Sequence, residues 1–93
     1  MIEKIKPWRN KQYLAWVHER PCCYCGHPGP SDPHHVIGLG FGGMGTKASD
    51  HLAVPLCREH HNQLHEGRIE KDFQLAWLFK TLDAAFSEGI LHG

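Results

Sequence analysis

The segment CREHHNQLH at residues 57–65 places one cysteine and three histidines close together in the chain. Earlier stand the pair His34-His35 and the motif Cys22-x-x-Cys25. These three pieces together hold seven side chains suited to metal binding and one further histidine. A tetrahedral metal site uses only four ligands. The sequence therefore predicts two metal sites with different tasks.

Chain length favours one small domain over residues 1–93, with its central part at about residues 20–67. Such a chain buries only about 60–65% of its unfolded surface, so a bound metal or a disulfide would add stability. The N-terminal residues lack the apolar segment of a secretory signal, and no apolar run approaches the roughly 20 residues that span a bilayer. We therefore expect a cytoplasmic protein without a membrane partner, whose four cysteines bind metal rather than form disulfides.

The charge balance argues weakly against tight nonspecific binding of nucleic acid. The formal net charge is +0 with histidine neutral, whereas such binding depends on lysine and arginine side chains that neutralise phosphates. Positive charge is nevertheless concentrated in residues 1–20. We expect any nucleic-acid contact to come from this segment and from Lys47, Arg58 and Arg68.

Hydrophobic patterning predicts an α+β fold. Asn10 is a suitable cap for a first helix, and the proline at position 21 disfavours helix at Arg20 and ends it. Residues 38–45 hold five glycines and are expected to form a loop. The strands on either side of this loop can pair as a hairpin. The expected elements are a helix at about residues 10–19, strands at residues 34–37 and 52–56, and helices at about residues 58–66 and 70–87.

The last expected helix is rich in apolar residues. Packing on the first helix would bury its apolar face and complete the core. A contact between two copies of the chain is the alternative, because this is a large apolar surface for a small domain. The residues of the predicted main stripe are Leu75, Leu78, Phe79, Leu82 and Phe86.

Two half-sites, Cys22-x-x-Cys25 and Cys57-x-x-His60, form the first predicted metal site. This spacing lets two side chains of a tight turn converge on one ion, and closed sites of four sulfur and nitrogen ligands hold structural zinc. Zinc would tie both ends of the hairpin together and contribute to folding. The alternatives are ordinary buried thiols and a redox motif, although no βαβ pattern surrounds these cysteines. Cys23 is expected to point elsewhere.

Three histidines form the second predicted site. His61 and His65 lie one turn apart on a predicted helix, and His34 could supply a third ligand from the first strand. Three protein ligands leave positions open for water or phosphate, as catalytic metal sites do. His35 points to the opposite face of an extended strand, so it is free to act as a general base near neutral pH.

The order of these motifs resembles the HNH endonucleases, which have a ββα-metal (His-Me finger) fold. The resemblance covers about residues 8–67. It rests on the His-His pair, the glycine loop, SDHL at residues 49–52 and LCREHHNQLH at residues 56–65. The segments DPHHVIG at residues 32–38 and GGMGTK at residues 42–47 are similar, more narrowly, to phage and prophage proteins of the recombination-enhancement nuclease type.

This resemblance implies an endonuclease that hydrolyses DNA phosphodiester bonds, by nicking or by double-strand cleavage. It implies that His35 takes the general-base position and that DNA is a partner, with a recombination protein as a further partner in the narrower group. The central position of the motif, usually asparagine, is His51 here, so either His51 or Asp50 would steady the base. The implied ligands of the catalytic divalent ion, which is Mg²⁺, Mn²⁺, Ni²⁺ or Zn²⁺, are His34, His61 and His65.

Two other classes of function stay open. A noncatalytic structural-zinc module that binds nucleic acid or protein would explain the cysteine-containing site but would leave the other histidines without a task. A metal-dependent hydrolase acting on a different substrate is also compatible with an open metal site. Metal content separates the first alternative from the nuclease, because the module needs about one ion per chain and the nuclease about two.

Overall fold

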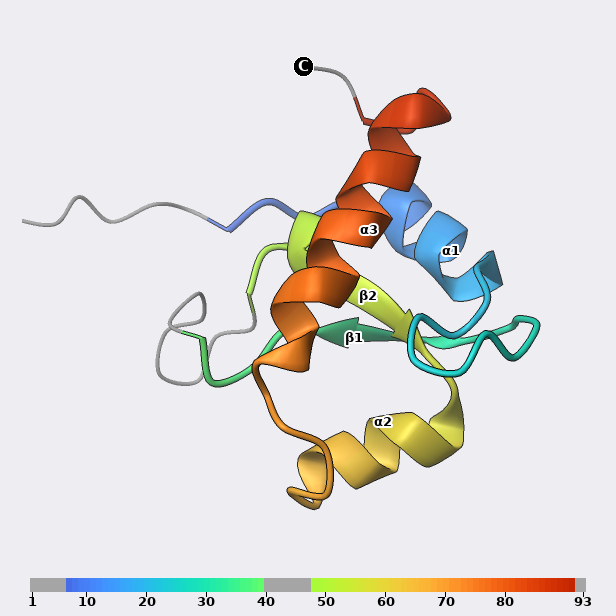
Figure 1. Cartoon of the computed structure of the whole chain (residues 1–93). Helices are drawn as coiled ribbons and strands as arrows, with labels where there is room; N and C mark the ends of the chain where they lie inside the picture. Colours follow the sequence, from blue (N-terminus) through green and yellow to red (C-terminus); the bar gives the residue numbers. More distant parts are fainter. Residues whose placement is uncertain (1–6, 40–47, 92–93) are drawn as a thin grey trace, which may run out of the picture.

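The computed structural model describes residues 7–39 and 48–91, and in this part of the chain it has the expected α+β character (Figure 1). Three α-helices surround two antiparallel strands. None of the described helices is long and apolar enough to cross a membrane. The elements are α1 (Lys11–Glu19), β1 (Asp32–His35), the short 3-10 helix η1 (Asp50–Leu52), β2 (Ala53–Leu56), α2 (Arg58–His65) and α3 (Phe73–Ser87).

The hairpin of β1 and β2 carries the histidine pair, and β1 begins two residues earlier than predicted. Its register places His34 opposite Val54 and Pro33 opposite Pro55. Neither proline has an N–H, so the two can face each other only at a pair that exchanges no backbone hydrogen bonds. Pro33 therefore belongs to the strand rather than to the preceding turn.

Helix α1 begins and ends close to the predicted positions. Asn10 caps it, because Oδ1 accepts a hydrogen bond from Tyr13 N at 2.9 Å. Arg20, which precedes a proline, has an extended backbone and ends the helix. Tyr13 and Val17 are buried and pack with Ala85 of α3. The first and last helices therefore contact each other, as expected.

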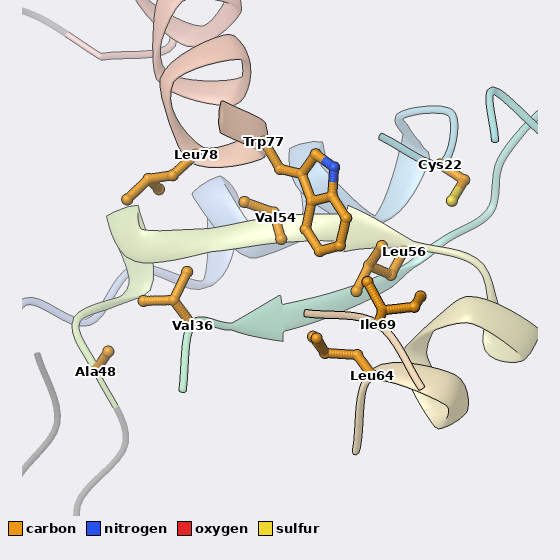
Figure 2. Packing of buried hydrophobic residues seen from close by; sticks show 9 residues of the cluster. All are labelled: Cys22, Val36, Ala48, Val54, Leu56, Leu64, Ile69, Trp77 and Leu78. Carbon is orange, nitrogen blue, oxygen red and sulfur yellow. The ribbon is translucent and has the colours of Figure 1, made fainter. Parts of the chain in front are cut away.

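The main core lies between the hairpin, α2 and α3 (Figure 2). Trp77 and Leu78 reach from α3 toward Val54 of β2, and Leu64 of α2 belongs to the same cluster. Val54, Leu56 and Leu64 are all 0% exposed, and burial of each such side chain contributes about 1.5–3 kcal/mol. Because the packing of Leu64 holds α2 in place, it also determines where the histidines of that helix point.

The last helix, α3, begins at Phe73, three residues later than predicted, because the segment before it is not helical. Gly67 ends the preceding helix with φ of 80°, a conformation that favours glycine. Residues 70–72 then form a tighter turn, in which Phe73 N donates to Glu70 O at 3.2 Å. Such i to i+3 bonds commonly precede a regular α-helix.

Helix α3 buries a face that only partly matches the predicted stripe. Of the predicted stripe, Leu75, Phe79 and Phe86 are exposed, and Phe79 is 69% exposed. The prediction was wrong for these three residues, whereas Leu78 is buried and Leu82 packs against the core. The residues that α3 buries are Gln74, Trp77, Leu78, Thr81 and Ala85.

Candidate metal centres

Cysteine and histidine side chains from both ends of the hairpin form a first cluster. Cys22 and Cys25 lie on the turn before β1, Cys57 follows β2 directly, and His60 is in the first turn of α2. One ligand atom of each residue lies within 4.8 Å of the others. Cys57 Sγ is 3.1 Å from His60 Nδ1 and 3.9 Å from Cys25 Sγ. These separations suit one ion with bonds of about 2.0–2.3 Å to nitrogen and sulfur.

A tight turn brings the first two cysteines of this cluster together. Gly26 N donates to Cys22 O at 2.8 Å, and Gly26 has φ of 77°, which residues with a side chain rarely adopt. Tyr24 N points at Cys22 Sγ at 3.4 Å. Cys23 N donates to Pro55 O at 2.9 Å and so ties the turn to β2. The side chain of Cys23 packs against the main core and stays outside the cluster.

The cysteine pKa values reflect these surroundings. Burial by itself would raise the pKa of Cys22, but hydrogen bonds with backbone groups of Cys57, Cys25 and Tyr24 outweigh it and lower the pKa to about 6. Burial raises the pKa of Cys23 to about 12. Since the thiolate is the form that binds metal, Cys22 suits a cation at neutral pH and Cys23 does not. With all the cysteines present as free thiols, the cluster is consistent with a structural zinc site.

A second cluster consists of His34, His61 and His65. His34 is a buried residue of β1, and the other two lie one turn apart on α2. One ring nitrogen of each lies within 4.8 Å of the others. The Nε2 atoms of His61 and His65 are 3.1 Å apart, as expected for two imidazoles that share an ion at about 2.0–2.1 Å. The three rings can hold one divalent ion and leave coordination positions open.

Two polar residues orient the rings of this second cluster. Gln74 Oε1 lies 2.9 Å from His34 Nε2, and Asp32 Oδ2 lies 3.2 Å from His61 Nδ1. Metal-binding histidines commonly donate their second N–H to such a partner, which fixes the ring. Burial lowers the pKa of His34 to about 4, so this ring is neutral, as a metal ligand must be. A hydrogen bond from Arg58 holds the pKa of Asp32 below its usual value.

His35 follows in β1 and is hydrogen-bonded to a buried carboxylate. Its Nε2 lies 2.8 Å from Asp50 Oδ1. Asn10 N donates to Asp50 Oδ2 at 2.7 Å, and Arg9 Nη1 donates to Oδ1 at 3.2 Å. Burial would raise the pKa of Asp50, but hydrogen bonds with His35, Asn10 and Arg9 outweigh it and lower that pKa. An ionised Asp50 can only accept, so Nε2 of His35 carries a proton, and in the neutral ring the lone pair is on Nδ1.

An open pocket of about 470 Å³ lies beside this histidine. Arg9 and Lys11 bring positive charge to the pocket, and the carboxylate of Asp50, which pairs with Arg9, offsets part of it. The expectation that the N-terminal segment supplies phosphate contacts stays a prediction. The residues that line the pocket are Arg9, Asn10, Lys11, Leu14, His35 and Asp50.

The structure distinguishes between the two residues considered for the central position of the motif. Asp50 is the one bonded to His35, whereas His51 packs against Trp8 with ring centroids 5.6 Å apart. Both belong to η1, where adjacent residues point in different directions. Asp50 is therefore better placed than His51 to orient His35, and a role for either residue beside a base stays a prediction.

The cationic residues predicted to contact nucleic acid are only partly described. Arg58 and Arg68 have exposed side chains, at 78% and 70%, and each pairs with a carboxylate of the chain. Both guanidinium groups are accessible from solvent. Lys47 and the glycine-rich residues 40–45 lie outside the described residues.

The sequence did not predict the two residues that orient the rings of the second cluster, although each has a recognisable signal in the sequence. Asp32 stands two positions before His34, and residues at this spacing share one face of a strand. Gln74 stands one turn before Trp77 and Leu78, in the apolar part of the last helix. A polar side chain in such a place needs a hydrogen-bond partner, and here the partner is a candidate metal ligand.

Comparison with known proteins places the chain among relatives without identifying an HNH family. The "Uncharacterized protein YdfU" of Escherichia coli (strain K12) is similar, with 44% identity over 94 residues that cover 97% of this chain. The chain spans only 27% of the length of that relative. No solved structure matches the chain. A family model described as "Protein of unknown function (DUF968)" matches residues 1–89, and the chain therefore belongs to the DUF968 family.

Proposed function

We propose that this protein is a metal-dependent endonuclease of the HNH type that hydrolyses DNA phosphodiester bonds. The observation that carries the proposal is the pairing of two features on adjacent residues. His34 forms a cluster with His61 and His65 that would leave coordination positions of an ion open. The residue after His34, His35, is hydrogen-bonded to the buried carboxylate of Asp50. A histidine held by a carboxylate is a common arrangement for a general base.

In this proposal His35 removes a proton from the attacking water through Nδ1. Asp50 keeps the ring in the required tautomer and stabilises the positive charge that forms when the proton arrives. Asn10 and Arg9 hold Asp50 in place through hydrogen bonds. Arg9 and Lys11 also line the adjoining pocket, where they attract the phosphate backbone. The scissile phosphate would lie at the edge of β1, from which both faces of the strand can be reached.

The ligand chemistry of the histidine cluster favours particular metals. Imidazole nitrogens suit zinc and nickel, whereas magnesium and manganese prefer carboxylate, carbonyl and water oxygens. The cluster offers three imidazoles, so we expect Zn²⁺ or Ni²⁺ to bind more tightly than Mg²⁺ or Mn²⁺. A divalent ion bound there supplies positive charge that stabilises the phosphate in the transition state.

A plasmid-nicking assay tests the proposal. The protein is incubated with supercoiled plasmid and Zn²⁺, Ni²⁺, Mn²⁺ or Mg²⁺ in separate reactions, beside the variants His35→Ala and His27→Ala. We expect His35→Ala to lower the nicking rate by about 100-fold or more and to bind metal as the parent does. His27 is an exposed histidine outside both clusters, so its variant should nick at the parent rate. A His35→Ala protein that nicks at the parent rate would show that the base assignment is wrong.

A second candidate is a noncatalytic structural-zinc module that binds nucleic acid or protein. It needs only the first cluster, Cys22, Cys25, Cys57 and His60, so the findings support it more directly. It does not explain the histidine cluster or the bond between His35 and Asp50. Metal analysis that finds about one zinc per chain, together with no nicking under any metal, would favour the module. DNA, a second copy of the chain and a recombination protein stay predicted partners.

A further inference from the structure

We propose that Gln74 is a positioning residue that fixes the tautomer of His34 and thereby aims one ring nitrogen at the ion site. This inference rests on the proposed function, because it concerns the same histidine cluster. Gln74 belongs to α3, which lies after the hairpin and α2 in the chain. It is 0% exposed. Burying an amide is costly unless its hydrogen bonds are made, so its partners indicate its role.

The hydrogen bonds of Gln74 leave its amide only one orientation. Nε2 donates to Ile37 O at 2.8 Å and to Lys71 O at 3.0 Å, and both of these partners are carbonyl oxygens. Oε1 accepts from Ile37 N at 2.9 Å. An amide turned by 180° would set oxygen against two carbonyls and an NH₂ group against an N–H. The oxygen therefore faces His34.

This orientation determines which nitrogen of His34 carries the proton. Oε1 of Gln74 is an acceptor and lies 2.9 Å from Nε2 of His34. A short contact of this kind requires a donor, so Nε2 carries the proton. In the neutral ring the lone pair is then on Nδ1. Nδ1 is therefore the nitrogen with which His34 can bind an ion shared with His61 and His65.

The side chain of Gln74 has two roles. Gln74 satisfies the backbone N–H and C=O of Ile37, just beyond β1, and it sets the ring of His34. Its bonds to the backbone of Ile37 are structural and would be needed without any ion. Its bond to His34 matters for ion binding, because a ring in the wrong tautomer would offer the ion an N–H instead of a lone pair. A test must therefore read the tautomer itself.

The first measurement uses the parent protein with zinc in the cysteine cluster and no ion at the histidine cluster. Long-range ¹H–¹⁵N correlation spectra, recorded above the ordinary histidine pKa, distinguish an Nε2–H ring from an Nδ1–H ring. We expect His34 to be an Nε2–H ring, and an Nδ1–H ring would overturn the inference. The measurement needs neither an ion at the histidine cluster nor a variant that folds.

The second measurement compares variants by titration with Ni²⁺ after the cysteine cluster has been filled with zinc. Gln74→Met removes the acceptor and should populate both tautomers, which weakens binding by about 10–100-fold. Gln74→Glu keeps an acceptor beside His34, so binding should stay near the parent value even if stability falls. Thr81→Val is the matched control, because Thr81 is also buried on α3 but donates only to Trp77 O, at 2.8 Å. It should bind Ni²⁺ as the parent does.

The outcomes separate this inference from the proposed function. A parent protein that binds no ion at the histidine cluster overturns the proposed function, and the role of Gln74 in ion binding with it. A parent that binds Ni²⁺ and a Gln74→Met variant that binds equally tightly overturn only the role of Gln74. Loss of binding in Gln74→Glu as severe as in Gln74→Met would also contradict it, because a structural defect alone explains that result.

Discussion

Nδ1 of His61 lies 3.2 Å from Oδ2 of Asp32, so a side chain of β1 orients a ring of α2. The same carboxylate accepts a hydrogen bond from Arg58 Nε at 2.8 Å. Because this bond lowers the pKa of Asp32, the carboxylate stays ionised and Nδ1 of His61 is the donor. Nε2 is left to face His65. A carboxylate in this place also makes the ring a stronger metal ligand.

Replacing this carboxylate should weaken the histidine cluster as an ion site. We expect Asp32→Ala to lower the affinity for Ni²⁺ by about 10–100-fold, measured by calorimetric titration with the cysteine cluster already filled. The control is Asp83→Ala, which removes an exposed carboxylate of α3 and should leave the affinity unchanged. Equal affinities for Asp32→Ala and the parent would mean that the Asp32–His61 bond has no part in binding.

The cysteine cluster should make folding depend on zinc. Cys57→Ser is expected to lose one zinc per chain and to unfold at a lower temperature, because ion binding energy contributes to folding. Cys23→Ala should keep its zinc, since Cys23 lies outside the cluster. Metal analysis and thermal denaturation followed by circular dichroism measure both effects. A parent protein whose melting temperature is unaffected by a strong chelator would contradict a structural role.

Two neighbouring residues of α3 test which face of that helix is buried. Leu78 is 4% exposed and Phe79 is 69% exposed. We expect Leu78→Ala to lower the free energy of unfolding by about 2–5 kcal/mol, and Phe79→Ala to change it by no more than about 0.5 kcal/mol. Urea denaturation of the two variants and the parent provides the measurement. The reverse order of effects would show that α3 buries the face that carries Phe79 instead.

The bond between His35 and Asp50 should appear in the pH dependence of stability. The pKa of Asp50 is lowered in the folded state, so its ionised form favours folding. This contribution is fully present above the unfolded pKa of about 3.9, and it is lost as the pH falls through the lower folded value.

Asp50→Asn should therefore be less stable than the parent by about 1.5–3 kcal/mol near neutral pH, the usual contribution of hydrogen bonds to a charged group. The difference should shrink as the pH falls below the folded pKa. Denaturing both proteins in the same zinc-containing buffer keeps the contribution of zinc equal in the two. A difference that does not change with pH would show that the charge of Asp50 does not contribute.

Local signals in the sequence were sufficient for most element positions. The Asn10 cap and the proline after Arg20 act on neighbouring residues, so they locate α1 without any knowledge of the fold. Motif spacing also acts locally: it groups Cys22 with Cys25, Cys57 with His60, and His61 with His65, because two ligands on one turn or one helix are already close. Their roles as ligands stay predictions.

The sequence could not reveal relationships that depend on packing between distant segments. Pro33 belongs to β1 only because it faces Pro55 across the hairpin. The buried face of α3 includes Gln74 because His34 and Ile37 offer it partners 40 and 37 residues away. An amphipathic pattern treats a glutamine as surface, and only a tertiary partner can reverse that assignment.

Adjacent positions of β1 face opposite sides of the hairpin, and His34 and His35 occupy two of them. Gaining or losing one residue within this strand would turn every later side chain to the other side. Relatives that keep both imidazoles in their present surroundings should therefore tolerate changes of length in the connecting loops but none between Asp32 and His35.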